Sequence, residues 1–213
     1  VENGATWFLP ESQILNKAIN HCSTPYIIMS DGDCIPRTDF VEIHVKHRKL
    51  GWFLSGGYFM LPMNISNLIT IEDIYKGHCF NLKWLKSNGL KSSFKNNKLT
   101  AKGFKSWFLN RITPTNASWN GHNVSGWKKD IIAVNGFDER MQYGGQDREL
   151  GERLFNHGLK SQQIRYSSIC VHLDHPRGYK TKKSIDKNLE IRRIVKSEKR
   201  AWTDFGIINS ETD

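Results

Sequence analysis

The order of apolar and polar residues along the chain predicts alternating helices and strands, as in an α/β protein. The predicted helices cover residues 11–21, 39–50, about 66–77 and 147–157, and the predicted strands cover 25–30 and 52–61. The run Tyr26–Met29 is short, β-branched and aromatic, which is typical of an interior strand of a largely parallel sheet. No internal repeat or low-complexity tract interrupts this pattern.

Capping residues and glycines refine these elements. Thr38 and Ser66 can cap the helices that follow them. Gly56 and Gly57 lie inside the strand pattern at 52–61 and indicate a bulge or a close backbone approach to a ligand. Gly158 suits the C-terminal end of the helix at 147–157.

Two aspartates, Asp31 and Asp33, directly follow the predicted strand at 25–30. Ligands of open α/β sheets bind beyond the carboxyl ends of strands, and two carboxylates there repel each other unless a cation lies between them. Oxygen ligands of this kind suit magnesium, manganese or calcium. The same Asp-Gly-Asp triplet is also common in plain turns, so both interpretations stay open at this point.

A calcium loop of the EF-hand type does not fit these residues. Asp31, Asp33 and Glu42 stand at positions 1, 3 and 12 of such a loop, but position 6, which needs glycine, is Pro36.

Composition limits the kinds of protein that the chain can form. Its 213 residues can bury one substantial core, and a mean hydropathy of −0.54 predicts a soluble globular protein. No apolar run approaches the roughly 18 residues that span a bilayer. The four cysteines lack C-x-x-C spacing, so neither a zinc site nor a disulfide framework is indicated and a reducing cytoplasm is expected.

The net charge of +10 is concentrated in one part of the chain. No acidic residue occurs between Asp73 and Asp130, where basic residues alternate with Trp, Phe and Leu, mainly over 76–111. This basic aromatic insertion suits an anionic membrane surface or a polyanionic partner. It is also typical of a solvated, partly helical segment whose aromatics pack on the main core. Nucleic acid is not favoured as a partner, because no recognised binding motif accompanies the charge.

The segment Gly144-Gly145-Gln146-Asp147 leads into the last predicted helix. Two glycines let the backbone approach a ligand closely, and the helix dipole favours the ionised form of Asp147 in the first turn. An ionised carboxylate at a cleft can act as a general base. An Asp at a helix start is also commonly a simple cap.

Five motifs follow one another in a fixed order: D-G-D, G-H-N-V-S-G-W, V-N-G-F-D-E, G-G-Q-D-R-E-L and V-H-L-D-H-P. This ordered set resembles the family 2 glycosyltransferases over roughly Trp7 to Tyr179, and its C-terminal part is similar to the galactosyltransferase catalytic lobe. The resemblance implies an α/β GT-A fold with a mixed central sheet at 1–179, including the insertion 76–111. A basic helical extension, 180–213, would follow it.

The activity that the resemblance implies is transfer of a sugar, with inversion, from a nucleotide diphosphate donor. A UDP-sugar is the expected donor, and manganese or magnesium is the expected cofactor. The acceptor would be a saccharide or a lipid-linked saccharide in surface polysaccharide synthesis. The implied location is the cytoplasm, at the inner face of the cell membrane.

The resemblance also implies roles for individual residues. Asp33 would ligate the metal and Asp31 would face the donor ribose or sugar, while His172, or alternatively His175, would complete the metal site. Asp147 would be the base that takes the proton of the acceptor hydroxyl. The residues expected to border donor and acceptor are Gly121, Asn123, Asp138 with Glu139, Tyr143, Gly145 and Gln146. For His172, packing of a loop after the strand-like run is the competing explanation.

General chemistry supports this division of roles. The leaving diphosphate gains negative charge, which a metal can neutralise without proton transfer. In-line attack on the anomeric carbon requires a base on the opposite face of the sugar, and therefore a separate carboxylate.

The sequence departs from the family pattern in two ways. Gln146 replaces the usual Glu beside the base. Only one helix precedes the strand at 25–30, so the first strands of the fold are expected to be missing, with Val1 an internal position and the missing segment removed or contributed by a partner chain. An open sheet edge or exposed apolar face beside that strand is then expected. The alternative function is a non-catalytic binding module for an anionic polymer or membrane, built on a transferase-like lobe.

Overall fold

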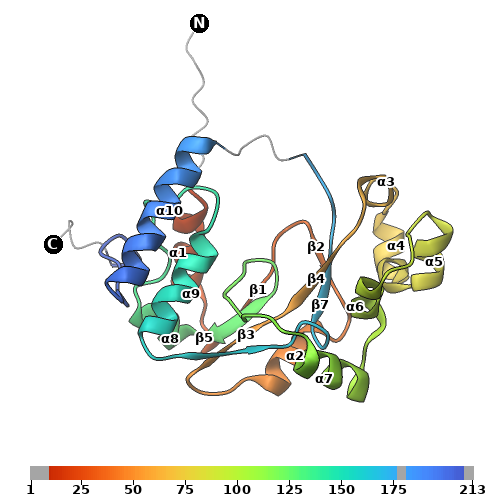
Figure 1. Cartoon of the computed structure of the whole chain (residues 1–213), viewed down its shortest axis with the longest axis horizontal. Helices are drawn as coiled ribbons and strands as arrows, with labels where there is room; N and C mark the ends of the chain where they lie inside the picture. The colour runs from red at the N-terminus through yellow and green to blue at the C-terminus, as the bar shows by residue number, and fades with distance from the viewer. Residues whose placement is uncertain (1–9, 177–180, 209–213) are drawn as a thin grey trace, which may run out of the picture. The chain divides into compact units, whose positions relative to one another are not determined.

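The computed structural model describes residues 10–176 and 181–208 (Figure 1). They form two compact units. Within the described part of the chain, the first unit contains 10–27, 128–158 and 181–208, and the second contains 28–127 and 159–176.

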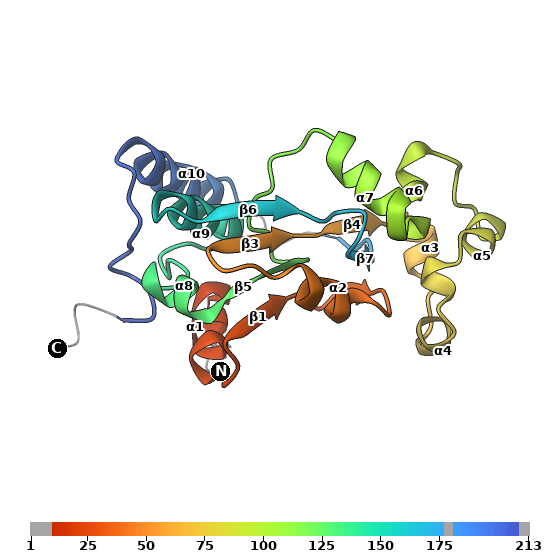
Figure 2. The same cartoon turned by 90° about the horizontal axis from the view of Figure 1, so that it is seen from below.

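The first unit is built from helices. They are α1 (Glu11–His21), α8 (Lys128–Ala133), α9 (Gln146–Asn156) and α10 (Lys182–Ser197). Helices α9 and α10 pack along each other, as Figures 1 and 2 both show. The side chain of Asn156 at the end of α9 donates hydrogen bonds to the carbonyls of Val195 and Arg200, which fixes the C-terminal end of α10.

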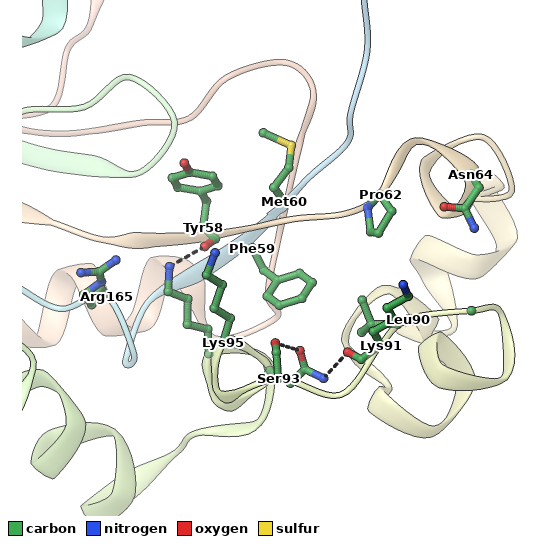
Figure 3. A pocket seen from close by; sticks show the side chains of 13 residues that line it. Tyr58, Phe59, Met60, Pro62, Asn64, Leu90, Lys91, Ser93, Lys95 and Arg165 are labelled. Atoms are coloured by element: carbon green, nitrogen blue, oxygen red, sulfur yellow. Dashed lines mark hydrogen bonds between the residues drawn. The ribbon is translucent and has the colours of Figure 1, made fainter.

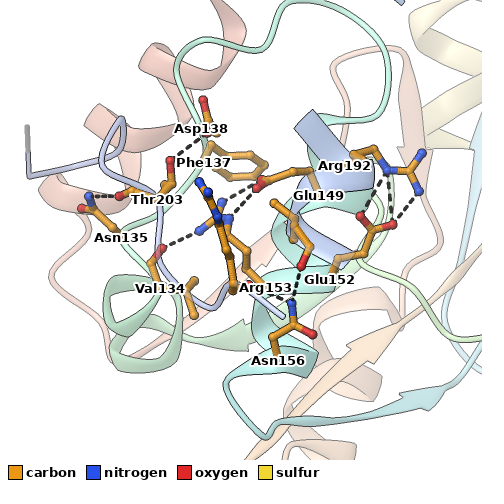
Figure 4. A network of polar contacts seen from close by, with 12 residues as sticks. Val134, Asn135, Phe137, Asp138, Glu149, Glu152, Arg153, Asn156, Arg192 and Thr203 are labelled. Carbon is orange, nitrogen blue, oxygen red and sulfur yellow. Dashed lines mark hydrogen bonds and ion pairs between the residues drawn. The ribbon is translucent and has the colours of Figure 1, made fainter. Parts of the chain in front are cut away.

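A buried ion pair lies at the centre of the first unit (Figure 4). Glu149 and Arg153, one turn apart on α9, are completely buried and contact each other through two hydrogen bonds of 2.6 and 2.8 Å. Arg153 also donates to the carbonyls of Val134 and Gly136. The guanidinium therefore ties α9 to the segment that follows α8.

The strands lie in the second unit, apart from Tyr26 and Ile27 of β1, which belong to the first unit. They form two sheets (Figure 2). The first has the order β1-β5-β3-β6, formed by Tyr26–Met29, Val124–Trp127, Trp52–Ser55 and Lys160–Gln163. The second has the order β2-β7-β4, formed by Cys34–Pro36, Ile169–His172 and Gly57–Met60. Each sheet is mixed, because β3 is antiparallel to β5 and parallel to β6, and β7 is antiparallel to β2 and parallel to β4.

The expected position of the Tyr26–Met29 strand was wrong in one respect. This strand, β1, lies at the edge of a mixed sheet and not inside a largely parallel one, and three of its four side chains are only half-buried. In the described part of the chain its one neighbour is β5, so the expected open edge is present.

The single strand predicted at 52–61 is two strands in different sheets. Gly56 separates β3 from β4, and a side chain there would collide with the side chain of Asn123. A side chain at Gly57 would collide with the backbone of Arg165. The close approach predicted for these glycines is therefore to the protein itself and not to a ligand.

Two predicted caps were also wrong. Helix α2 (Phe40–His47) begins after Asp39, without a side-chain cap from Thr38. Ser66 ends the short helix α3 (Met63–Ser66), and its hydroxyl bonds the carbonyl of Leu61 and the amide of Asp174. The next helix, α4 (Ile71–Tyr75), is capped by Thr70, which forms a reciprocal capping box with Asp73.

The basic aromatic insertion is helical and only partly packed. It contains α5 (Leu82–Ser87), α6 (Asn97–Thr100), α7 (Gly103–Ile112) and two short 3₁₀ turns, His78–Phe80 and Phe94–Asn96. Leu85, Leu90 and Leu99 lie in a buried cluster with Phe59 and Val171 of the sheet. Other aromatics of the insertion are exposed. No helix among the described residues has the length and apolarity needed to cross a membrane.

Candidate active site

Strand pairing brings the Asp-Gly-Asp turn to a histidine far away in the sequence. Because β2 runs antiparallel to β7, Cys34 lies opposite His172, and the amide of Leu173 donates to the carbonyl of Asp33. Asp31, Asp33, Cys34 and His172 each place a potential ligand atom within 4.8 Å of the others. The second unit therefore contains a cluster of acidic and imidazole groups at the end of β1.

Both predicted histidines reach the same carboxylate. Nε2 of His172 lies 3.5 Å and Nε2 of His175 3.0 Å from Oδ2 of Asp33, and the two rings stack in parallel. Each Nδ1 contacts a backbone carbonyl, of Leu173 and Pro176 respectively, at 2.8 and 2.9 Å. Because a carbonyl can only accept, each Nδ1 is the donor of its pair, so in the neutral tautomer that a metal requires the lone pair would lie on Nε2, the nitrogen that faces Asp33.

Asp33 itself fits a cation. Its Oδ1 is buried and has no hydrogen-bond partner among the described residues. Burial and the nearby charge of Asp33 raise the pKa of Asp31, so the two carboxylates destabilise each other when both are ionised. A divalent cation beside them would give Oδ1 of Asp33 a partner and would reduce the repulsion between the two carboxylates.

Cys34 belongs to this cluster by position only. Its buried thiol contacts Cys170, and this hydrogen bond and the burial strongly raise the pKa of Cys34. The thiol therefore stays neutral, and the available donor set is oxygen and imidazole nitrogen. All four cysteines, Cys22, Cys34, Cys79 and Cys170, are free thiols.

Sequence reasoning missed two aromatic neighbours of the cluster, Tyr58 and His122. The Tyr58 ring meets the rings of His122 and His172, with centroid distances of 4.5 and 5.9 Å. Burial and the neighbouring His172 and Lys98 lower the pKa of His122 to about 4, so this imidazole is neutral. The available signal was the G-H-N segment, in which only the residues on either side of His122 were assigned a role.

Gly121 and Asn123, predicted to border the donor sugar, lie beside His122. The side chain of Asn123 is fully buried, and it donates to the carbonyls of Gly57 and Ser168. Its oxygen accepts from Nε2 of His44 at 2.8 Å, while the Ser125 hydroxyl bonds the other ring nitrogen. Burial lowers the pKa of His44 to about 4. These bonds commit the side chain of Asn123 to the fold.

The predicted base, Asp147, lies at the start of α9 in the first unit. Gly144 and Gly145 have φ angles of +108° and +95°, which glycine adopts without strain. Gln146 is buried, and its side chain accepts from the Gly144 amide and donates to Glu11. Asp147 is half-buried in the first turn of α9, where the helix dipole stabilises a carboxylate.

The residues before α9 are held by structural contacts. Burial alone would raise the pKa of Asp138, but hydrogen bonds from Arg140 and Thr203 outweigh it and lower the pKa (Figure 4). Glu139 accepts from Asn16 at 2.9 Å. The side-chain amide of Asn188 on α10 donates to the carbonyls of Gln142, Tyr143 and Gly144. Asp138 therefore has a structural role, because it binds Arg140 and Thr203. Tyr143 lies in a loop whose backbone is bonded to α10.

Two clusters of predicted residues result. Asp31, Asp33, His172 and His175 lie together in the second unit, and Tyr143, Gly145, Gln146 and Asp147 lie together in the first. Asp138 is committed to Arg140 and Thr203.

The chain was compared with known protein families and with curated proteins. Residues 112–176 match the family model described as the N-terminal domain of galactosyltransferase. This interval includes Asn123, Asp147, His172 and His175, and the Asp31-Gly32-Asp33 turn lies outside it. No curated protein matches the chain. The match supports a galactosyltransferase-like glycosyltransferase domain, and the mixed α/β architecture is compatible with a fold of that class.

Proposed function

We propose that the chain is a metal-dependent, inverting glycosyltransferase with a GT-A fold of the family 2 type. It transfers a sugar from a nucleotide diphosphate donor, a UDP-sugar by preference, to a saccharide or lipid-linked acceptor in surface polysaccharide synthesis. The observation that carries this proposal is the environment of Asp33: its Oδ1 is buried without a hydrogen-bond partner among the described residues, and its Oδ2 faces two imidazoles. The galactosyltransferase match over 112–176 supports the reaction class.

Asp33, His172 and His175 would hold the divalent metal, with Asp31 beside them toward the donor. Magnesium binds almost entirely through oxygen, so two imidazoles favour manganese. When bound, the metal supplies positive charge to the leaving diphosphate. The backbone carbonyls of Leu173 and Pro176 keep each Nε2 available for it.

Asp147 would accept the proton of the acceptor hydroxyl. As the new C–O bond forms at the anomeric carbon, the bond to the diphosphate breaks and the hydroxyl proton passes to the carboxylate. Asp147 lies in the first turn of α9, where the helix dipole favours a carboxylate. The donor and acceptor contacts of Gly121, Asn123, Tyr143 and Gly145 remain part of this proposal.

An anionic membrane surface would be the cellular setting, at the cytoplasmic face. Helix α7 supports this proposal because Phe104, Trp107 and Phe108 are 77%, 53% and 46% exposed on one side of it. Its inner side is anchored by the buried Leu109 and by Asn110, which donates to Ser167. Lys102, Lys105 and Arg111 flank the exposed rings, as in helices that lie in a bilayer interface. The free thiols suit a reducing compartment.

A screen of nucleotide sugars tests the proposed activity. We expect release of nucleoside diphosphate from one donor in the presence of Mn²⁺, and its loss in EDTA and in Asp33→Asn. Equal release in EDTA, or by the Asp33→Asn variant, would contradict metal dependence. Binding to anionic vesicles without turnover of any donor would favour the non-catalytic binding module.

A further inference from the structure

A basic pocket lies in the second unit, between β4 and the insertion (Figure 3). Its volume is about 680 Å³. The walls come from β4 and the residues after it, the loop at 89–96, Lys98 of α6, and Arg165. Four of the lining side chains are cations: Lys91, Lys95, Lys98 and Arg165.

These cations have no acidic counterpart. The lining contains no Asp or Glu, and in the part of the chain that the structure describes Lys91, Lys95 and Arg165 form no ion pair. Like charges gathered without a counter-ion raise the energy of the folded chain, and a bound anion would relieve this repulsion.

Lys98 is half-buried in the wall of this pocket. Its ammonium donates to the Tyr58 carbonyl at 3.1 Å and lies 5.4 Å from the centre of the Tyr58 ring. Burial and the neighbouring Arg165 and Lys95 lower the pKa of Lys98 to about 8. A charge-assisted hydrogen bond to an oxyanion would stabilise its charged form.

The pocket is also formed in advance. The buried Asn96 accepts from the Ser93 hydroxyl at 2.9 Å and donates to the Lys91 carbonyl at 3.1 Å, which fixes the loop that carries the cations (Figure 3). Leu90 and Phe59 anchor the two walls in the buried cluster. Binding therefore needs little ordering of the backbone.

We propose that this pocket binds a phosphate or sulfate group carried by the acceptor saccharide. The cations would contact the oxyanion, and the apolar part of the wall, formed by Phe59, Pro62 and Leu90, would contact the carbon skeleton that carries it. The assignment to the acceptor rests on the proposed transferase function, whereas binding of the oxyanion does not.

Calorimetric titration with sodium sulfate tests the oxyanion site, because sulfate stays a dianion across the pH range used. We expect one sulfate per chain in the wild type and at least tenfold weaker binding in Lys95→Gln/Arg165→Gln. The control Lys46→Gln/Arg48→Gln removes the same charge from exposed positions of the same unit and should bind within about twofold of the wild type. Unchanged binding in the pocket variant, or an equal loss in the control, would overturn the proposal; circular dichroism and melting check that both variants fold.

The dependence of sulfate affinity on pH gives a second measurement. Lys98 loses its proton as pH rises through about 8, so sulfate affinity should fall there. The groups that face Lys98 are Lys95, Arg165, Tyr58, His122 and Cys170. An affinity that stays constant from pH 7 to 9 would remove Lys98 from the site.

Two further experiments follow. The first distinguishes an acceptor saccharide from a lipid headgroup as the source of the anion. The second separates the oxyanion site from the proposed metal site. Vesicles of phosphatidylglycerol should bind Lys95→Gln/Arg165→Gln as they bind the wild type, and loss of vesicle binding together with sulfate binding would overturn the acceptor assignment in favour of a lipid headgroup. Asp33→Asn should bind sulfate normally even though it binds no Mn²⁺, so failure of the metal site leaves this test intact. Loss of sulfate binding in Asp33→Asn would overturn a separate pocket.

Discussion

The carboxylates of Asp33 and Glu149 differ in how many of their oxygens have hydrogen-bond partners. Both oxygens of Glu149 accept hydrogen bonds from Arg153, and the pair is sealed from water. One oxygen of Asp33 is buried without a partner, and the other faces two imidazoles. A buried polar atom without a partner costs stability, and a bound cation would offset that cost at Asp33. The contrast separates a structural carboxylate from a candidate ligand.

Breaking the Glu149–Arg153 pair should cause a large loss of stability. Arg153→Met leaves the Glu149 carboxylate buried without its counter-charge and removes the bonds to the Val134 and Gly136 carbonyls. We expect the free energy of unfolding to fall by about 3 to 5 kcal/mol in urea denaturation. Arg193→Met, which breaks an exposed pair with Glu190, should cause no measurable change.

The double variant Glu149→Leu/Arg153→Met should recover part of that loss, because it leaves no buried charge unpaired. Equal stability of Arg153→Met and Arg193→Met would show that the buried pair does not hold the first unit together.

Asp147→Asn tests the assignment of the base. The amide keeps the shape of the side chain but cannot accept the acceptor proton as a carboxylate does. We expect donor affinity to stay nearly unchanged and transfer to fall by about 10² to 10⁴. Asp138→Asn and Glu139→Gln should slow the chemical step less, because both side chains are bonded to structural partners. Near-normal transfer by Asp147→Asn would identify another base.

At the level of elements, local patterns predicted some boundaries and not others. The helix at 11–21 and the strand within 25–30 were confirmed, and the helix expected at 147–157 begins one residue earlier, at Gln146. The prediction of a single strand at 52–61 was wrong. The strand is interrupted at Gly56, which lies against Asn123, a residue far away in the sequence. Thr70 and Asp73 have the spacing of a capping box, and the helix begins after Thr70 and not at Ser66.

Helix α7 is the element on which the proposed membrane binding would depend. Phe104→Ser/Trp107→Ser/Phe108→Ser removes the exposed rings, and we expect sedimentation with phosphatidylglycerol vesicles to weaken by about tenfold or more. Ile71→Ser/Tyr75→Ser on α4 removes two side chains that are 73% and 87% exposed and serves as the control. An equal loss in the control, or unchanged binding in the α7 variant, would mean that α7 is not the membrane contact.

At the scale of the whole molecule, the order of motifs predicted which residues lie together better than it predicted what surrounds them. The convergence of Asp33 with His172 and His175 follows from motif order, although only the β2–β7 pairing shows how it arises. The structural roles of Asn123 and Asp138 depend on His44 and Thr203, which no local pattern connects to them. The basic pocket was not predicted, because Arg165 joins Lys95 and Lys98 only after folding.

Calorimetric titration of Mn²⁺ and UDP into the wild type and Asp33→Asn tests the metal-dependent donor site directly. We expect UDP to bind the wild type in Mn²⁺ and at least tenfold more weakly in EDTA, and Asp33→Asn to lose affinity for both. Asp186→Asn, which alters an exposed carboxylate paired with Lys182 on α10, should bind like the wild type. Undiminished Mn²⁺ affinity in Asp33→Asn, or UDP binding of equal strength in EDTA, would contradict a metal site at Asp33.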